Sequence, residues 1–328
     1  MNKTEELIVK RAGELLDAKE VDKVIGWKKG EFCFDPSPAT FTSSAELKDF
    51  VYNDFCGANL SKYLVKECKS GGKIAVFLKP CDTYSFNELV KEHRVNKDAV
   101  KAIAVECHGK LDIEKIKAKG VSAVTGAEEK DGKILVTSLY GDAEFAKEEV
   151  LLNKCLACKS KKFAVADETI VVNEMEETKN DRFSGVEALE NMSDEERFAF
   201  WKAELSKCIR CNACRNVCPA CTCNKCVFDN NASGVATKAP ADTFEEQMFH
   251  IIRAYHVAGR CTDCGECSRV CPQNIPLHLL NRKFIKDINK LYGEFQAGEA
   301  DEGKHPLIEY TEGDAEPAAA VNGEAHHA

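Results

Sequence analysis

The cysteines are the residues in this sequence whose number and spacing point most directly to chemistry. The chain has 18 cysteines among 328 residues. Two stretches, 208–219 and 261–272, each read C-x2-C-x2-C-x3-C-P. Thiolates separated by two residues let one short loop reach three corners of an iron–sulfur cubane, and the proline then turns the chain away. The pattern therefore predicts two [4Fe-4S] clusters.

The fourth cysteine of each run is expected to serve the cluster of the other run, because that crossing is typical of two-cluster ferredoxins. The first thiol set is then Cys208, Cys211, Cys214 and Cys271, and the second thiol set is Cys261, Cys264, Cys267 and Cys218. The alternative is that these thiols bind zinc or form disulfides, since zinc ribbons also use C-x2-C. Two complete runs with matching prolines favour clusters.

The N-terminal half alternates apolar strands with helices. Strands are predicted at 74–78, 102–105 and 134–136, and an amphipathic helix is predicted at 3–18. This alternation is typical of a sheet with packed helices. We therefore expect an α/β N-terminal domain.

Four cysteines in this half occupy positions that suit a further metal site. Cys81 and Cys107 each follow a predicted strand, while Cys155 and Cys158 form a C-x2-C. Residues at consecutive strand ends can converge at one edge of a sheet, and four thiolates match a third [4Fe-4S] cluster. These four residues are the third thiol set. The alternative is two buried core cysteines beside a C-x2-C that binds zinc or occurs by chance.

The C-terminal half is predicted to be mainly helical. Ser193 and Glu196 form a capping box that starts a helix leading to the first cysteine run. A second helix should begin after Asp242, with an apolar face made by Phe244, Met248, Ile251, Ile252 and Tyr255. The expected domains are an α/β domain at 1–172, a linker at 173–192, a helical two-cluster ferredoxin domain at 193–292 and a disordered tail at 293–328.

Composition narrows the class of protein. A net charge of −9 makes nucleic acid an unexpected partner. No apolar run is long enough to span a bilayer, and the charged N-terminus lacks the apolar core of a signal peptide. Many cysteines without a secretion signal indicate the reducing cytoplasm, where thiolates bind metal rather than form disulfides.

Three further cysteines, Cys221, Cys223 and Cys226, follow the first run closely. They are one short of a four-cysteine site, so they either supply alternative cluster ligands or simply shelter the clusters. His250 and His256 lie on the second predicted helix; they are either ordinary surface or core residues, or they tune a cluster by hydrogen bonding.

Lys159, Lys161 and Lys162 form either a solvated patch or a positive group beside Cys155 and Cys158. In the second case they would raise the potential of the third cluster by stabilising its reduced, more negative state.

The N-terminal cysteine segments resemble those of a known family. These segments read K-P-C-D at 79–82, V-E-C-H-G at 105–109 and C-L-A-C at 155–158. They resemble the beta subunits of coenzyme F420-reducing hydrogenase and of F420-dependent formate dehydrogenase, over roughly residues 45–165. The C-terminal half is similar to beta subunits of soluble hydrogenases and to electron-transfer subunits associated with heterodisulfide reductases.

This resemblance implies that the third thiol set holds an iron–sulfur cluster beside a flavin. The F420-reducing members carry glycine-rich flavin-contacting segments on both sides of these cysteines, whereas residues 159–164 here read K-S-K-K-F-A. The sequence therefore supports the third cluster, but it does not support FAD.

No nucleophile elbow, P-loop or metalloprotease helix is present in the sequence. Our first hypothesis is a non-catalytic relay subunit that passes single electrons between a formate dehydrogenase or hydrogenase and a flavoprotein or heterodisulfide-reductase-like subunit. The second is a flavin-containing subunit that itself reduces F420 or NAD(P). The third is a metal-stabilised scaffold without a redox role.

Overall fold

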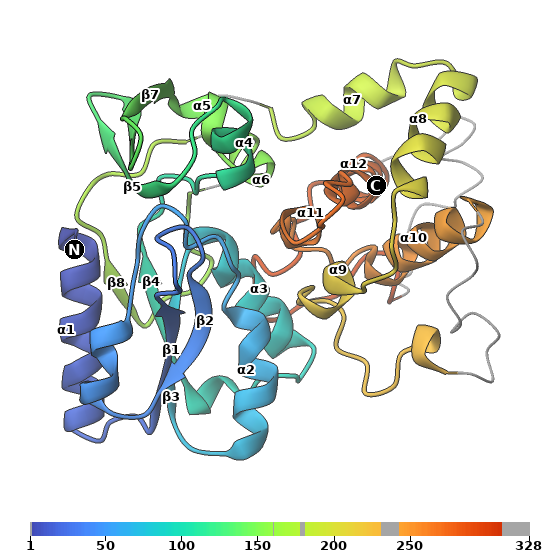
Figure 1. Cartoon of the computed structure of the whole chain (residues 1–328). Helices are drawn as coiled ribbons and strands as arrows, with labels where there is room; N and C mark the ends of the chain where they lie inside the picture. Colours follow the sequence, from blue (N-terminus) through green and yellow to red (C-terminus); the bar gives the residue numbers. More distant parts are fainter. Residues whose placement is uncertain (1, 160, 178–180, 231–242, 310–328) are drawn as a thin grey trace. The chain divides into compact units, whose positions relative to one another are not determined.

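The computed structural model describes residues 2–159, 161–177, 181–230 and 243–309, and the chain divides into two compact units, 1–180 and 181–328. The first unit is an α/β domain and the second is helical (Figure 1). The predicted fold class is therefore confirmed. The division between the units falls inside the segment predicted as a linker.

The first unit is built on a five-stranded sheet with the order β2-β1-β3-β4-β8. Its strands are β1 (Lys23–Lys28), β2 (Ser37–Phe41), β3 (Ile74–Leu78), β4 (Val100–Val105) and β8 (Glu168–Ile170). The β1–β2 pair is antiparallel and the other pairs are parallel. Every side chain of β3 is buried, as expected for a central parallel strand covered on both faces.

Helices cover this sheet. Helix α1 (Lys3–Asp17) packs on β1, β3 and β8, whereas α3 (Pro80–Lys91) packs on β3 and β4 and contacts α2 (Ser61–Glu67). Helix α3 begins directly after β3, because Pro80 occupies its first turn, where no backbone N–H is needed. Short 3-10 helices lie at Ser44–Asp49 (η1), Cys68–Ser70 (η2) and Lys97–Ala99 (η3).

The third predicted strand, 134–136, does form, but it belongs to a different sheet from 74–78 and 102–105. A second, antiparallel sheet contains β5 (Val124–Lys130), β6 (Lys133–Ser138) and β7 (Ala143–Ala146). Asp131 and Gly132 join β5 to β6 with positive φ angles of 52° and 76°, the backbone of a tight hairpin turn. Short helices α4 (Ile113–Ala118), α5 (Lys147–Val150) and α6 (Asn153–Leu156) complete the unit.

The second unit contains no described strand. Its helices are α7 (Ser184–Glu190), α8 (Asp194–Ser206), α9 (Ala213–Asn216), η4 (Val227–Asp229), α10 (Thr243–Val257), α11 (Glu266–Arg269) and α12 (Leu277–Tyr292). The Ser193–Glu196 capping box is present at the start of α8, as predicted. Helix α7 lies within the predicted linker. In the predicted tail, Ala297 and His305 are buried, and residues 310–328 lie outside the described ranges.

Helix α10 forms as predicted, but its buried face is not the expected one. Phe244 and Tyr255 are 67% and 64% exposed, and Met248 and Ile251 are also exposed. The buried side chains come instead from the opposite, more polar face: Glu246, Phe249, His250, Arg253 and Val257. This is the face that meets the cysteine loops, where Glu246 pairs with Arg210 and Arg253 donates to the carbonyl oxygen of Cys214.

Candidate metal centres

The two cysteine runs of the second unit fold in the same way. In each run the residue before the second cysteine and the residue after it have left-handed backbone angles. These are Arg210 and Asn212 in the first run, with φ of 53° and 61°, and Asp263 and Gly265 in the second, with φ of 54° and 67°. A one-turn helix, α9 or α11, then carries the third cysteine. The repeated backbone turns each loop around one centre.

The structure brings the first thiol set together. One cavity of the second unit is bordered by Cys208, Cys211, Cys214 and Cys271. Its remaining wall includes Phe249, His250, Ile275 and Leu277. Cys271 comes from the second run, so this arrangement joins cysteines of both runs at one cavity.

The second thiol set is close enough for its charges to interact. Burial raises the pKa of Cys267 to about 12, Arg253 opposes that rise, and the thiols of Cys218 and Cys264 add to it. Burial likewise raises the pKa of Cys261, followed by the charges of Asp263 and Cys218. Cys218 of the first run therefore lies within electrostatic reach of cysteines from the second run.

Arg253, on the buried face of α10, links the two sets. It is 3% exposed, and its Nη2 donates to the carbonyl oxygen of Cys214 at 2.9 Å. Burial alone would lower the pKa of Arg253, but Cys218, Cys267 and Cys214 raise it, so the guanidinium stays charged. Sequence reasoning missed this residue, because the apolar periodicity of α10 pointed to the opposite face.

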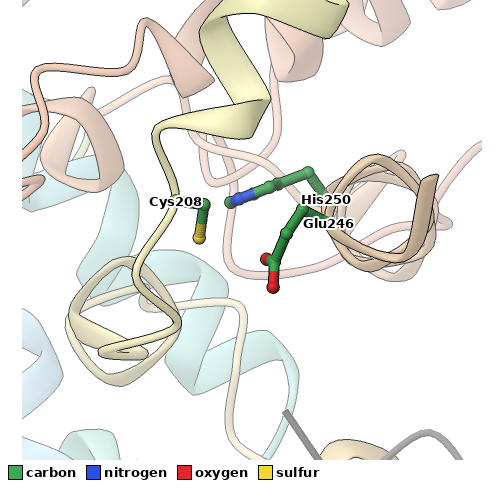
Figure 2. Close-up of side chains that lie close together, drawn as sticks. All are labelled: Cys208, Glu246 and His250. Atoms are coloured by element: carbon green, nitrogen blue, oxygen red, sulfur yellow. The ribbon is translucent and has the colours of Figure 1, made fainter. Parts of the chain in front are cut away.

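The half-buried thiol of Cys208 and two buried side chains meet at the edge of the first thiol set. The ligand atoms of Cys208, Glu246 and His250 all lie within 4.8 Å of one another. Figure 2 shows Glu246 and His250 projecting from α10 toward Cys208, which follows α8. Glu246 is paired with Arg210, whose Nε lies 3.1 Å from Oε2. Burial raises the pKa of the Cys208 thiol to about 12.

His250 has an unusual environment for a polar side chain. It is 2% exposed, and neither ring nitrogen has a hydrogen-bond partner among the described residues. Burial, followed by the charges of Arg253 and Arg210, lowers its pKa to about 3, so the imidazole is neutral. Buried polar atoms in native proteins nearly always have partners. Its place in the wall of the cavity therefore fits a group with acceptor atoms, such as the sulfurs of a cluster, inside that cavity.

The third thiol set also comes together, at the end of the first unit's sheet. Cys81 lies in the first turn of α3, Cys107 follows β4, and Cys155 and Cys158 lie in and after α6. The ammonium of Lys161 interacts electrostatically with all four thiols, which raise its pKa against the effect of burial.

Four buried lysines surround this set and are called the lysine group: Lys79, Lys110, Lys154 and Lys161. Each ammonium donates to a backbone carbonyl, at distances of 2.6, 2.8, 2.8 and 3.0 Å, respectively. Lys79 is also paired with Asp82 at 2.8 Å. Burial would raise the pKa of Cys107, but Lys110, Lys161 and Lys79 lower it below its ordinary value. Among these lysines, sequence reasoning had considered Lys161 alone.

The geometry also bears on the zinc and disulfide alternatives. Four sulfurs bound to one zinc at about 2.3 Å would lie roughly 4 Å apart. Among the described residues, the single group of three or more ligand atoms within 4.8 Å is the one containing Cys208, Glu246 and His250. Neither the thiol sets nor Cys221, Cys223 and Cys226 converge in that way, and none of the 18 cysteines, every one of them described, forms a disulfide. A cubane places its thiolates on four separate irons, so it suits the wider spacing.

Across the described ranges, no helix has the length and apolar character needed to cross a bilayer.

Comparison with known proteins places this chain among iron–sulfur proteins. Residues 204–275 match the family described as the 4Fe-4S dicluster domain. The chain is 26% identical to the F420-dependent formate dehydrogenase subunit beta of Methanocaldococcus jannaschii, over 83% of this chain and 86% of that protein. It is 27% identical to the F420-dependent formate dehydrogenase 1 subunit beta of Methanococcus maripaludis, over 89% and 90%.

A shorter relative covers the cysteine-rich half, and one solved structure has a weak likeness. The putative ferredoxin-3 of Sinorhizobium fredii is 33% identical over 24% of this chain and 75% of that protein. A chain of the F420-reducing [NiFe] hydrogenase complex from Methanosarcina barkeri has a TM-score of 0.37 and 15% identity, covering 47% of this chain and 57% of that chain. The resemblance to formate dehydrogenase beta subunits predicted from the cysteine segments is confirmed by the sequence relatives.

Proposed function

We propose that this chain, whose residues 204–275 match the 4Fe-4S dicluster domain, is an electron-transfer subunit of a multi-subunit oxidoreductase. The observation that carries this proposal is the gathering of thiols: one cavity wall holds all of the first thiol set, and a single ammonium interacts with all of the third. A [4Fe-4S] cluster with four thiolate ligands transfers one electron at a time and has no iron open to a substrate.

The residues of this chain would hold and shield the clusters. The first and second thiol sets hold two clusters, with Cys218 and Cys271 exchanged between the runs. The third thiol set holds a third cluster. Arg253 and the lysine group supply positive charge that lowers the cost of burying anionic thiolates. Cys221, Cys223 and Cys226 shelter the clusters in this proposal.

The relatives suggest the partners. By analogy with beta subunits of F420-dependent formate dehydrogenases, the chain would accept electrons from a formate-oxidising subunit or a hydrogenase. It would pass them to a flavoprotein or a heterodisulfide-reductase-like subunit. The need to keep many thiols reduced for metal binding supports a cytoplasmic location in this proposal.

The competing function is a subunit that binds FAD and itself reduces F420 or NAD(P). That reaction needs a carrier that collects two electrons and delivers hydride, which is flavin chemistry and not cluster chemistry. After Cys158 the sequence reads K-S-K-K-F-A and lacks the glycine-rich segment of the F420-reducing members, which argues against a flavin site of the usual type.

The decisive experiment uses the anaerobically reconstituted full chain without partners. We expect it to accept electrons from dithionite or a reduced viologen and to reduce neither F420 nor NAD. Adding a formate-oxidising subunit should then allow formate to reduce its clusters. If the isolated chain contained stoichiometric flavin and reduced F420 without partners, the relay function would be wrong and the flavin-containing alternative would be correct. Failure of the full chain to assemble any cluster would rule out both functions.

A further inference from the structure

We propose that the imidazole of His250 donates an N–H hydrogen bond to a sulfur of the first cluster and thereby raises the midpoint potential of that cluster. This inference rests on the proposed function, because it requires a cluster in the cavity lined by Cys208, Cys211, Cys214 and Cys271. It adds a residue that adjusts the electron affinity of one particular centre, and so helps to set the order in which electrons move through the protein.

The first argument is the unmet hydrogen-bonding capacity of the side chain. A neutral imidazole has one N–H donor and one acceptor nitrogen. In His250 both lack a partner among the described residues, although the side chain is 2% exposed and out of reach of bulk water. An unpaired hydrogen-bond donor destabilises a protein when it is buried, because it has lost the water that would otherwise accept its hydrogen bond. A structure that retains such a donor therefore implies an acceptor beside it.

The second argument is location. His250 lines the same cavity as the whole first thiol set, and the ring points toward Cys208 (Figure 2). The nearest ligand atoms of these two residues lie within 4.8 Å of each other. Ile275 and Leu277 supply apolar walls to this cavity. The sulfurs of a bound cluster are the acceptors that would face the ring.

The third argument is that neighbouring groups leave the imidazole available to the cavity. Glu246 is one turn earlier on α10; its carboxylate lies 3.1 Å from Arg210 Nε, and neither ring nitrogen of His250 is hydrogen-bonded to it. Phe249 packs against the imidazole with ring centroids 4.9 Å apart and limits its rotation. The guanidinium of Arg253 is engaged by the Cys214 carbonyl, to which it donates at 2.9 Å.

The direction of the effect follows from electrostatics. Reduction adds negative charge to a cluster, and a hydrogen bond to one of its sulfurs stabilises that added charge. Removing the donor should therefore make the cluster harder to reduce. A change of packing or polarity alone can also shift the potential, so recovery by a side chain that carries an N–H group is what identifies the donor.

The test compares His250→Leu, which removes the donor, with His250→Gln, which keeps an N–H group. The matched control is His256→Leu, the same change on the same helix at an exposed side chain. Full-length protein is reconstituted, assayed for iron, and titrated potentiometrically by EPR. The signal of the first cluster is identified as the one that Cys211→Ser perturbs.

We expect His250→Leu to shift the midpoint potential of that signal downward with unchanged iron content. His250→Gln should recover at least part of the shift, and His256→Leu should leave the potential unchanged. An unshifted potential in His250→Leu would overturn the proposal. Loss of about four irons in His250→Leu, with a directly bonded nitrogen coupling in the wild type, would overturn it in favour of a ligand role.

A readout on the wild type keeps the proposal testable if His250→Leu does not fold. Pulsed EPR of the reduced first cluster should show a weakly coupled exchangeable proton that disappears in heavy water. Absence of any such proton would also overturn the proposal. In both cases a normal iron content leaves the electron-transfer function standing, so the two failures are distinguishable.

Discussion

At the residue scale, the buried thiols are costly to ionise before metal arrives. Burial raises the pKa of both Cys208 and Cys267 to about 12. Each must lose its proton to become a ligand, so cluster assembly releases protons and should be favoured by higher pH. Arg253 and the lysine group reduce this cost by placing positive charge beside the thiols.

The crossing of ligands between the two runs gives the first prediction. Cys218→Ser should damage the cluster held by Cys261, Cys264 and Cys267, because Cys218 lies in electrostatic contact with Cys261 and Cys267. Cys271→Ser should damage the other cluster, since Cys271 borders the cavity of the first thiol set. EPR spectra of the reduced variants test this. The crossing is wrong if Cys218→Ser and Cys211→Ser change the same signal.

The lysine group gives a second prediction at this scale. Lys161→Gln keeps a donor for the Cys107 carbonyl, which Lys161 contacts at 3.0 Å, but removes the positive charge. A unit charge in a partly buried site is worth on the order of 1 kcal/mol or more, so the potential of the third cluster should fall. Lys23→Gln, in the same unit, is the control, because Lys23 is paired with Glu67 instead. Equal potentials in both variants would argue against a tuning role.

At the element scale, the edge strand β8 is attached to the rest of the first unit by a charged network. Glu168 of β8 accepts from Arg11 of α1 through both carboxylate oxygens, at 2.7 and 2.8 Å. Lys101 of β4 lies 2.8 Å from the same carboxylate. These contacts join a short strand, which has little backbone pairing of its own, to a helix and to the neighbouring strand.

This network predicts a pH-dependent stability. Hydrogen bonds from Arg11, opposed by burial and reinforced by Lys101, lower the pKa of Glu168 from 4.5 to about 2. A lowered native pKa stabilises the fold above the ordinary value, and that stabilisation is lost as the pH falls toward 2. Because the group is partly exposed, Glu168→Gln should cost about 1 kcal/mol at pH 7.

Unfolding of the metal-free chain at several pH values measures the effect. The difference between wild type and Glu168→Gln should shrink as the pH falls below about 4.5, the ordinary pKa. Glu14→Gln is the control, since Glu14 is a more exposed partner of the same arginine. A difference that stays constant down to low pH would assign the loss to packing instead of charge.

At the scale of the whole molecule, each compact unit contains its own thiol groupings. The first unit holds the third thiol set, and the second unit holds the two sets of the dicluster domain. Two relatives that match most of this chain's length are beta subunits of F420-dependent formate dehydrogenases. A chain with several one-electron centres and two units suits a relay between other subunits.

Iron content is the prediction for the whole molecule. The fully loaded chain should contain about 12 irons, from three clusters of four. Cys155→Ser should lower the value to about 8, because Cys155 belongs to the third thiol set and the other unit is untouched. Iron and sulfide assays after anaerobic reconstitution measure both. If the wild-type iron content reached a plateau near 8 irons, the third cluster would be ruled out, and Cys81, Cys107, Cys155 and Cys158 would be core thiols.

The sequence by itself determined the features that depend on local spacing. The two C-x2-C-x2-C-x3-C-P runs predicted matching loops, which the repeated left-handed angles at Arg210 and Asp263 now display. The Ser193 cap and the buried strand β3 were also readable, because caps and central parallel strands have short-range signatures.

Tertiary structure alone decided which groups surround the thiols. The lysine group comes from positions spread between 79 and 161, and its members meet only because strand ends and loops converge. On α10, periodicity favoured the face with Phe244 and Tyr255, but packing against the cysteine loops buried His250 and Arg253. The spacing of apolar residues along a helix predicts which face avoids water. It does not predict which charged or polar side chains will be buried against distant parts of the chain.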